Sequence, residues 1–415
     1  MTDVEIVNPV DADEAEAWAL VSATALLAPV AGEKYRRRIH RLTGSWLPER
    51  VWGARADGRW VANLATMPRR LGVPAGSTGT HEVAADAVTA VGVAATHRRR
   101  GLLSAMITSS LAAAAARGDA VSILWSAEWP IYGRYGYAPA AWENSYVLHP
   151  RRTRPLLDPP RGRLYGASRA EAGVLAPAVY DAARRRRAGE IDRPDPWWSQ
   201  LLGLDGHVAQ DDDVVPVVHE GADGADGLLL WRTTQRFGLH DDMGGVQVTQ
   251  LVAASDDAYR DLWAYLCGLD GVAKIEINAR PQDEPIRWQL RDARALHTEA
   301  SGDALWLRLL DVPAALSTRG YAGSDRLVLE VADPAGFCGG VFELAADGGA
   351  ARCEPRDAAP DLRLDQRALA ACYLGGNRLR AVSSGLAVEE VTPGAIDRFD
   401  ALFATSWAPW TSTAF

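Results

Sequence analysis

The chain has 415 residues and a formal net charge of −9, from 44 lysines and arginines against 53 aspartates and glutamates. At about 150 residues per domain this length predicts two or three domains, and a hydrophobic content of 48% indicates a folded protein rather than a disordered one. The negative charge argues against nucleic acids and anionic membranes as partners, and it is compatible with cationic small molecules as ligands.

The cysteine and histidine spacings give no sign of a metal centre. The cysteines lie far apart without a CxxC pair, which disfavours a zinc site and a disulfide framework. The histidines form no HxH or HExxH pattern, so we expect no metal. The first residues lack the basic stretch and apolar core of a signal peptide, and no apolar run is long enough to span a bilayer. These features predict a cytoplasmic protein with reduced thiols.

Residues 1–150 alternate strand and helix signals, which indicates a first domain of mixed α/β type. The dipeptide Asp57-Gly58 favours a tight turn between two strands, and Gly118 marks the end of a run of helix formers. In chain order we expect a helix at 18–27, a hairpin of strands at 51–55 and 60–66, a strand at 88–94, a helix at 102–117 and a strand at 120–125.

The rest of the chain divides at a stretch rich in proline and arginine, 150–162, which we interpret as a linker. After it, the patterns predict helices at 169–187, 196–202 and 256–266 and strands at 228–233, 247–253 and 273–278. Beyond residue 300 they predict strands at 305–309, 326–331, 340–344 and 361–364 and helices at 313–318 and 366–374.

The most informative stretch, 91–102, is a strand that stops, a basic turn with one glycine, and then a helix. The first turn of a helix carries unpaired backbone N–H groups and the positive end of the helix dipole, which together favour an anion. Here Gly101 lets a ligand approach the backbone, and the arginines at 98–100 add positive charge. We expect a pyrophosphate at this turn and an extended amide-bearing arm, such as pantetheine, along the preceding strand. The alternative is a solvated basic turn.

A candidate acid follows the next strand. Segment 126–137 comes directly after the predicted strand 120–125, and diverging parallel strands open a crevice at their carboxyl ends. A phenol has an ordinary pKa of about 10, so it can give a proton to a departing thiolate at neutral pH. Tyr132 is therefore the candidate general acid, whereas we expect Tyr135 and Tyr137 to pack as core aromatic residues.

These two motifs resemble the GNAT superfamily of acetyl-CoA-dependent N-acetyltransferases, and the fuller match is to the Eis (enhanced intracellular survival) family. The matching segments are THRRRGLL at 96–103, IYGRYGY at 131–137, LVLEVAD at 327–333, CYLGG at 372–376 and a terminal phenylalanine. The resemblance spans nearly the whole chain. It implies a mixed α/β (α+β) fold with tandem GNAT-like domains at 1–150 and 151–297, then a sterol-carrier-protein-like domain at 298–415. It also implies a homohexamer.

The resemblance further implies roles for individual residues around acetyl-CoA as co-substrate. Tyr132 would be the general acid, and the α-carboxylate of Phe415 would be the general base. Val91, Gly92 and Val93 would pair with the pantetheine arm. The pyrophosphate and the border of the coenzyme would be contacted by Arg98, Arg99, Arg100, Gly101, Leu102, Leu103, Ser104, Ala127 and Glu128.

The acceptor implied by the resemblance is a primary amine of the aminoglycoside, polyamine or lysine type, and the negative net charge agrees with such cations. Trp18, on the first helix, is a candidate wall of the amine pocket, with core packing as the alternative. Ala414 precedes the terminal residue and adds no acidic group to the cleft, a departure that weakens the aminoglycoside assignment.

Two further segments bear on where the chemistry takes place. The tail, 407–415, holds tryptophans and a phenylalanine, whereas frayed tails are usually polar, so we expect it to dock. Burial would raise the pKa of its carboxyl from an ordinary value of about 3.5 toward that of a useful base; the alternative is a tail that only packs.

In the second segment, Ser255 begins a helix with Asp256 and Asp257, whose carboxylates would repel a pyrophosphate. We therefore expect no coenzyme site there.

Two other functions stay open. Tandem GNAT-like halves with a terminal carboxylate base also resemble an N-myristoyltransferase, which would need a long apolar acyl channel. A non-catalytic lipid-carrier or scaffold protein is the other alternative, although intact residues 91–101 and Tyr132 disfavour it.

Overall fold

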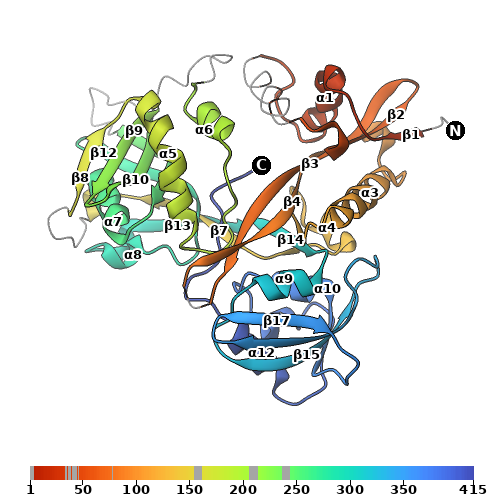
Figure 1. Ribbon diagram of the computed structural model, residues 1–415. Helices are drawn as coiled ribbons and strands as arrows, with labels where there is room; N and C mark the ends of the chain where they lie inside the picture. The colour runs from red at the N-terminus through yellow and green to blue at the C-terminus, as the bar shows by residue number, and fades with distance from the viewer. Residues whose placement is uncertain are drawn as a thin grey trace.

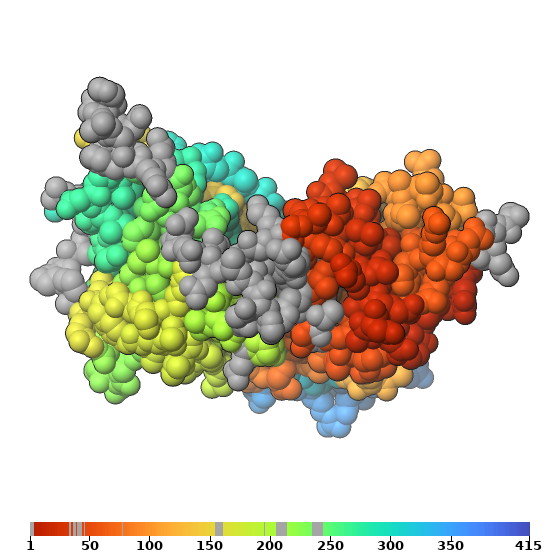
Figure 2. Space-filling model, turned by 90° about the horizontal axis from the view of Figure 1, so that it is seen from above, coloured from red at the N-terminus to blue at the C-terminus, as the bar shows by residue number. Residues whose placement is uncertain are grey.

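The computed structural model describes residues 4–32, 35, 39, 44, 46–76, 78–153, 161–204, 214–235 and 244–415. Over these residues the strands form two seven-stranded sheets and one five-stranded sheet. Figure 1 shows three lobes, with the red and orange N-terminal lobe beside the yellow and green lobe and the blue lobe below them. The C-terminus lies between the first two lobes, and the same two lobes lie side by side in Figure 2.

The first sheet has the strand order β1-β2-β3-β4-β5-β14-β6, in which β4 and β5 are parallel. Helix α3 connects these two strands and packs Met106, Ile107 and Leu111 into the apolar core, as a helix with buried residues at such spacing should. The elements are β1 (Val4–Val7), α1 (Ala15–Ala25), β2 (Val51–Ala56), β3 (Arg59–Pro74), β4 (Thr80–Val93), α3 (Leu102–Ala116), β5 (Val121–Trp125), α4 (Trp129–Tyr132), β6 (Ala138–Pro139) and β14 (Leu305–Leu309).

The second sheet has the order β13-β7-β12-β11-β10-β9-β8. Its parallel pair, β11 and β12, is joined by α7, so this sheet repeats the strand–helix–strand plan of the first. The elements are β7 (Trp142–Leu148), β8 (Arg163–Gly166), α5 (Arg169–Arg184), α6 (Asp195–Leu201), β9 (Val215–Gly221), β10 (Gly224–Gln235), β11 (Gly244–Ala253), α7 (Asp256–Cys267), β12 (Val272–Arg280), α8 (Ile286–Gln289) and β13 (Leu296–Asp303).

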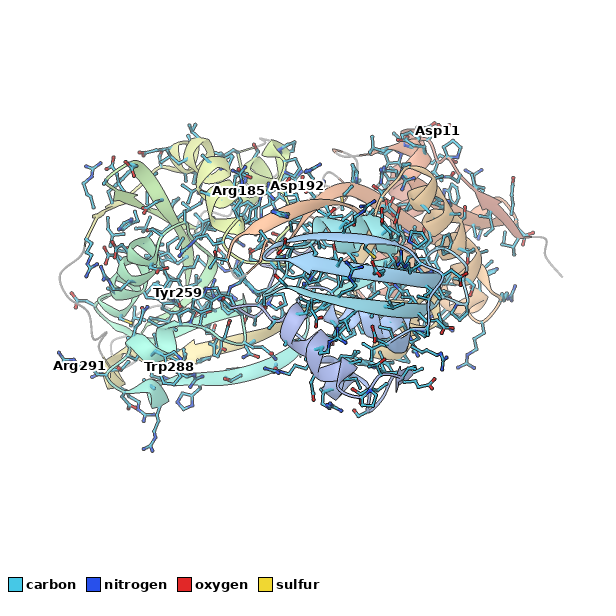
Figure 3. The ribbon with its side chains drawn as sticks, turned by 60° about the horizontal axis from the view of Figure 1, so that its bottom comes forward. Asp11, Arg185, Asp192, Tyr259, Trp288 and Arg291 are labelled. Carbon is cyan, nitrogen blue, oxygen red and sulfur yellow. The ribbon has the colours of Figure 1, made fainter. Side chains whose placement is uncertain are left out.

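The third sheet, in the order β17-β16-β15-β18-β19, shares a core with the first. Ile123 and Leu307 of the first sheet belong to the same buried cluster as Leu329 and Phe399 of the third lobe. In Figure 3 the blue sheet crosses in front of the long orange strand β3. The elements are α9 (Val312–Thr318), β15 (Asp325–Ala332), β16 (Gly340–Asp347), β17 (Ala350–Pro355), β18 (Leu362–Asp365), α10 (Gln366–Cys372), α11 (Leu379–Val382), β19 (Val388–Glu390) and α12 (Ala395–Phe403).

Two strands cross the linear boundaries that the sequence suggests. β7, expected in the first domain, pairs with β12 and β13 of the second sheet. β14, expected in the third, lies between β5 and β6 of the first sheet. Every residue of β14 is buried, as expected for a central strand of either sheet. The sequence of β14 therefore could not reveal which strands it pairs with. The sheets therefore do not follow divisions at residues 150 and 297.

The predicted helices and strands are present, with ends that shift by a few residues and with longer strands β3 and β4. Most of the predicted linker, 154–160, lies outside the described residues. Several strands were not predicted, because they are short or lack a clear apolar alternation: β1, β6, β7, β8, β9, β13, β17 and β19. Among the helices that the structure describes, none is long and apolar enough to cross a bilayer.

A buried ion pair connects the first sheet to the third lobe. Arg308 of β14 donates to both carboxylate oxygens of Asp333, at 3.0 and 2.8 Å, and to the carbonyl of Tyr135 at 2.5 Å. The side chains of Arg308 and Asp333 are almost fully buried. Burial raises the pKa of Asp333, but Arg308 and the N–H groups of Phe337 and Cys338 lower it more, so the pKa lies below its usual value.

Replacement of Asp333 by Asn should lower the free energy of unfolding by about 3–5 kcal/mol, because it leaves the Arg308 charge buried without its partner. Urea denaturation at pH 7 measures the loss. Since the folded pKa of Asp333 is depressed, its stabilisation is present above about pH 4 and disappears as the pH falls through the folded pKa. The variant should therefore lose less stability on acidification than the wild type. Equal stability at pH 7 would contradict this role.

Candidate active site

The first site feature is the divergence of β4 from β5. The two strands pair from Ala85 with Val121 to Val88 with Leu124, and within the described residues their pairing ends there. Ala90 has a left-handed φ of 51°, and the register of β4 against β3 shifts at this point. The end of β4, residues 89–93, thus has backbone groups free toward the gap. An extended amide-bearing ligand can add to such an edge.

The basic turn borders this gap. Gly101 precedes α3 with a φ of +79°, a conformation that glycine adopts readily and other residues rarely do. The side chains of Arg98 and Arg99 are exposed. A cleft of about 390 Å³ lies between this turn and α4. It is lined by Ala25, Leu26, Val91, Gly92, Val93, His97, Arg98, Arg99, Gly101, Leu102, Leu103, Ser104, Ala127, Glu128, Ile131, Tyr132, Arg134 and Tyr135.

The cleft brings together eleven of the twelve residues expected around the coenzyme; the exception is Arg100. Its Nη2 donates to the carbonyl of Thr96 at 3.2 Å, so the side chain turns back onto its own turn. Tyr135 packs against the core, as expected, but it also lines the cleft, and its hydroxyl lies 2.9 Å from Oγ of Ser104. Tyr137 is buried, as expected, and hydrogen-bonds Ser122 at 2.6 Å.

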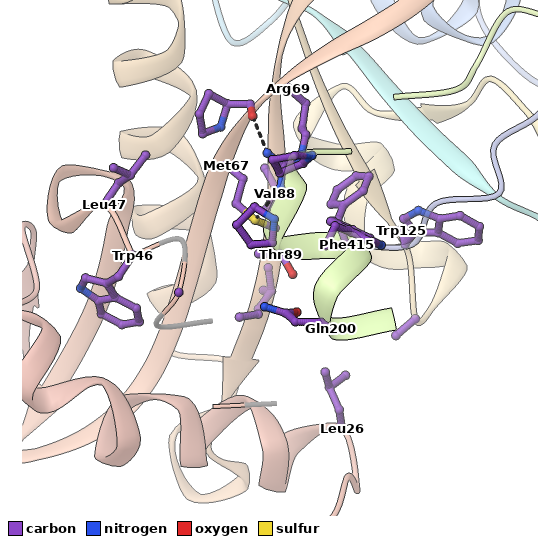
Figure 4. Close-up of a pocket in the computed structure, with 18 of the residues that line it drawn as sticks. Leu26, Trp46, Leu47, Met67, Arg69, Val88, Thr89, Trp125, Gln200 and Phe415 are labelled. Carbon is purple, nitrogen blue, oxygen red and sulfur yellow. Dashed lines mark hydrogen bonds between the residues drawn. The ribbon is translucent and has the colours of Figure 1, made fainter. Parts of the chain in front are cut away.

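A second cavity, of about 590 Å³, adjoins the cleft, and the two share Leu26, Val91, Ala127 and Tyr132. Figure 4 shows this cavity between strands of the first lobe and α6 of the second. Its other lining residues are Gly44, Trp46, Leu47, Met67, Pro68, Arg69, Val88, Thr89, Ala90, Trp125, Pro194, Pro196, Trp197, Gln200 and Phe415. One phenol therefore borders both spaces, and the chain's last residue borders the larger one.

Tyr132 ends the short helix α4 and is 6% exposed. Its ring meets that of Tyr137 edge to face, with centroids 6.0 Å apart. Burial, with a smaller contribution from Tyr135, raises the pKa of Tyr132 to about 12. The phenol is therefore fully protonated at neutral pH and can donate a hydrogen bond into either space.

Phe415 reaches the cavity because the tail before it is anchored by a buried carboxylate. Glu190 is 4% exposed and accepts hydrogen bonds from Thr411 Oγ1 at 3.2 Å and from Ser412 N and Oγ at 3.0 and 2.5 Å. The tail also crosses Gly189, whose φ is +103° and where a Cβ atom would lie 2.7 Å from the Trp410 backbone. The sequence expectation of a docked tail is met, by polar contacts as well as aromatic ones.

Two further side chains complete this anchor. Tyr180 of α5 donates to Glu190 at 3.0 Å, and its hydroxyl lies 2.9 Å from Oγ1 of Thr413. Arg193 donates to Thr413 Oγ1 at 2.8 Å and to the Ser412 hydroxyl at 2.8 Å. Thr413, two residues before Phe415, is almost fully buried, and Phe415 itself packs against the buried core cluster that the first and third sheets share. No sequence pattern marks Glu190 or Arg193, since both lie in an irregular segment.

The comparisons with known proteins agree with this arrangement. Residues 7–140 and 189–309 match family models described as acetyltransferase (GNAT) domains, and residues 312–412 match a sterol carrier protein domain. An uncharacterized N-acetyltransferase of Streptomyces griseus is 38% identical over 424 residues, which cover 100% of this chain and 99% of that one. The N-acetyltransferase Eis of Mycobacterium tuberculosis is 34% identical over 375 residues, 88% of each chain. The chain belongs to the Eis family.

The crystal structure of Eis1 from Mycobacterium abscessus matches the whole of both chains with a TM-score of 0.84 at 31% identity. The Eis-family chain described here thus has a mixed α/β fold with two GNAT domains followed by a sterol-carrier-protein-like domain. It is an N-acetyltransferase, an enzyme of the GNAT type, and GNAT acetyltransferases use acetyl-CoA.

Trp18 does not form a wall of the Eis-family cavity. It is fully buried, its Nε1 donates to the carbonyl of Trp52 at 2.8 Å, and its ring meets that of Trp46 edge to face at 5.1 Å. Trp46 is the tryptophan that lines the cavity. The inward face of α1 places Trp18 one layer behind it, so the core-packing alternative describes Trp18.

The second GNAT domain of this Eis-family chain has a different helix start. Ser255 caps α7 by accepting from the N–H of Ala258 at 2.9 Å, and its hydroxyl donates to Asp226 at 2.6 Å. Asp256 and Asp257 occupy the first turn. Carboxylates at this position already complement the helix dipole and repel a phosphate.

Proposed function

We propose that this Eis-family enzyme transfers the acetyl group of acetyl-CoA directly to a primary amine. The observation that carries the proposal is that the cleft beside the basic turn and the larger cavity share Tyr132, while Phe415 lines the cavity. A coenzyme in the cleft and an amine in the cavity would meet beside a phenol and a carboxylate. Direct transfer needs this meeting, because both reactants must be held in contact.

The coenzyme would supply the acetyl group as an activated thioester. Residues 91–93 would pair with its pantetheine arm along the free edge of β4. The backbone N–H groups of residues 101–104 would bind the pyrophosphate, with Arg98 and Arg99 adding positive charge. Residues 127–128 would border the coenzyme on the opposite wall. The acidic start of α7 supports a single coenzyme site, in the first domain.

The reaction needs a base that takes a proton from the acceptor nitrogen and an acid that gives a proton to the sulfur of the coenzyme. The α-carboxylate of Phe415 would take a proton from the amine, whose lone pair then attacks the thioester carbonyl. As the carbon–sulfur bond breaks, Tyr132 would give its proton to the sulfur. The raised pKa keeps the phenol protonated before each turnover, and it also makes the phenol a weak acid. Proton transfer should therefore follow the growth of negative charge on the sulfur.

The family resemblance offers aminoglycoside-, polyamine- and lysine-like amines as acceptors, and it also supports a homohexamer that works in the cytoplasm. The third domain would act by delivering the tail rather than by carrying lipid. This role for the third domain agrees with the path of the tail. The tail leaves the third domain and its Ser412 donates to Glu190.

Replacement of Arg99 by Ala should raise the KM for acetyl-CoA about 3- to 10-fold, because one cation near the pyrophosphate is lost. The increase should be largest at low ionic strength and should shrink in about 0.5 M salt, where charges are screened over a few ångströms. Steady-state kinetics at two salt concentrations measure both. Arg100→Ala is the comparison, and its smaller effect should follow from its position outside the cleft. An unchanged KM in Arg99→Ala would place the pyrophosphate elsewhere.

Replacement of Tyr132 by Phe should lower kcat about 100- to 1000-fold, as loss of a general acid does. The dissociation constant for coenzyme A should change little, and calorimetry checks it. In the wild type, kcat should not fall on the alkaline side up to about pH 10, because the pKa of Tyr132 is about 12. Thiol release followed over pH tests this. A variant with wild-type kcat would remove Tyr132 as the acid.

A short neutral extension after Phe415 should abolish acetyl transfer, because it converts the α-carboxylate to an amide and moves the charge to the end of the tag. Coenzyme binding and the melting temperature should stay near wild type, since the extension leaves the hydrogen bonds of Thr413 and the Phe415 side chain in place. The same tag at the N-terminus is the control. Full activity of the C-terminally extended enzyme would end the proposed role of this carboxylate.

A further inference from the structure

The charge inside the acceptor cavity is positive where a polyamine or aminoglycoside site should be negative. Among the described residues that line the cavity, Arg69 is the only side chain with a full charge, and none is an aspartate or glutamate. The remaining polar groups are Thr89, Gln200, Tyr132, the indole N–H groups of the three lining tryptophans and the α-carboxylate of Phe415. An amine with several positive charges would meet this cation with a single carboxylate, that of the chain end, to balance it.

Arg69 lies on β3 and is 9% exposed. Its Nη1 donates to the carbonyl of the neighbouring Pro68 at 2.8 Å, and its Nη2 contacts the sulfur of Met67 at 3.3 Å. Its Nε is buried and has no hydrogen-bond partner. The guanidinium also lies over the Trp197 ring, 5.7 Å from its centroid. The group is therefore held at the cavity with most of its donor capacity unused.

Three other buried arginines have ion pairs or several carbonyl acceptors, although the Nε of Arg308, like that of Arg69, is buried without a hydrogen-bond partner. Arg280 pairs with Glu284 at 2.7 Å, Arg308 pairs with Asp333, and Arg319 donates to three backbone carbonyls. Arg70, next to Arg69 on the same strand, is exposed and bonded to Glu82 at 2.5 Å. Within the described chain, Arg69 has no ion pair, and burial lowers its pKa while Asp192 acts in the opposite direction. A buried donor without a partner costs free energy unless a ligand completes it.

The walls around Arg69 indicate the rest of the ligand. Trp46, Trp125 and Trp197 line the cavity together with leucine, valine, methionine and proline side chains. Figure 4 shows Arg69 and Phe415 entering the same space, with Trp125 beside it. A volume of about 590 Å³ suits a small molecule with a flat apolar body.

We infer that the acceptor is an amine with an aromatic or apolar body that also carries a carboxylate, and that Arg69 binds this carboxylate. The inference rests on the proposed acetyl transfer and narrows its acceptor class. The amine end would lie toward Tyr132 and Phe415, where the acetyl group arrives. Polycationic amines would be poor acceptors.

The test uses pairs of amines that differ only in a carboxylate at the end of the ring opposite the amine: 4-(2-aminoethyl)benzoic acid and phenethylamine, and para-aminomethylbenzoic acid and benzylamine. Spermidine and kanamycin represent polycations. Each is measured by thiol release from acetyl-CoA and, independently of turnover, by calorimetric binding to the enzyme saturated with coenzyme A. The variants are Arg69→Met, Arg69→Lys and the matched control Arg70→Gln, whose side chain is outside the cavity.

In the wild type, at least one carboxylate-bearing amine should bind about 10- to 100-fold more tightly than its partner, as a charge-assisted contact predicts. Arg69→Met should remove this advantage by raising the KM and the dissociation constant of the carboxylate-bearing amines. The kcat for the amines that lack a carboxylate should stay at the wild-type value. Arg69→Lys should restore part of it, and Arg70→Gln should match the wild type.

Three results would overturn the inference. The first is that every amine without a carboxylate binds as tightly as, or more tightly than, its carboxylate-bearing counterpart. The second is that the enzyme binds spermidine or kanamycin more tightly than the carboxylate-bearing amines. The third is a uniform loss of kcat for all amines in Arg69→Met, which would mean that Arg69 positions the Phe415 carboxylate instead. Carboxylate-dependent binding without thiol release from any amine would contradict the acetyl-transfer proposal and leave the Arg69 contact in place, so the two failures are distinguishable.

Discussion

The buried carboxylate of Glu190 is the contact on which the arrangement of the site depends. Its side chain accepts from Tyr180 of the second lobe and from Thr411 and Ser412 of the tail, and its backbone carbonyl accepts from Gly72 of β3 at 2.8 Å. A carboxylate out of water is tolerated only when its oxygens are hydrogen-bonded. Tyr180 and the tail supply those donors, so the second lobe, the tail and β3 all meet at Glu190. The place of Phe415 follows from this anchor together with the packing of Phe415 against the buried core.

Among the described residues, several buried charged groups have ion pairs or several hydrogen bonds, whereas the Arg69 guanidinium faces a cavity without an ion pair. Glu190, Asp333 and Glu284 each have several donors or an arginine, and such complete networks stiffen a fold. Arg69 differs because it lines a cavity and has no ion pair among the described residues, whereas Arg308, whose Nε is also buried without a partner, is paired with Asp333. Departures of this kind are expected where function requires them, because the missing partner arrives from outside.

Much of the fold and of the coenzyme cleft could be predicted because the signals are local. The strand, the glycine turn and the helix start at 91–102 are consecutive in the chain, so this motif alone brings seven of the twelve expected residues to one cleft, and residues 103–104 and 127–128 supply four more. The position of β14 could not be predicted, because a short, mostly apolar strand fits the centre of any sheet. Arg69 and Arg70 are adjacent and must face opposite sides of β3, but only the tertiary structure decides which of them faces the cavity. Glu190 lies in an irregular segment, where periodicity says nothing.

The same reasoning explains why net charge alone does not determine the acceptor. Surface carboxylates act on a bound ligand through salt solution, where their field decays over about 8 Å. Arg69 acts across an apolar cavity, where the effective dielectric constant is lower and its charge is felt more strongly. A nearby cation also favours the neutral form of an amine, which is the form that attacks a thioester. Arg69 can therefore bind a carboxylate at one end of an acceptor and lower the pKa of the ammonium at the other, and a cavity lined with aspartates would oppose the second effect.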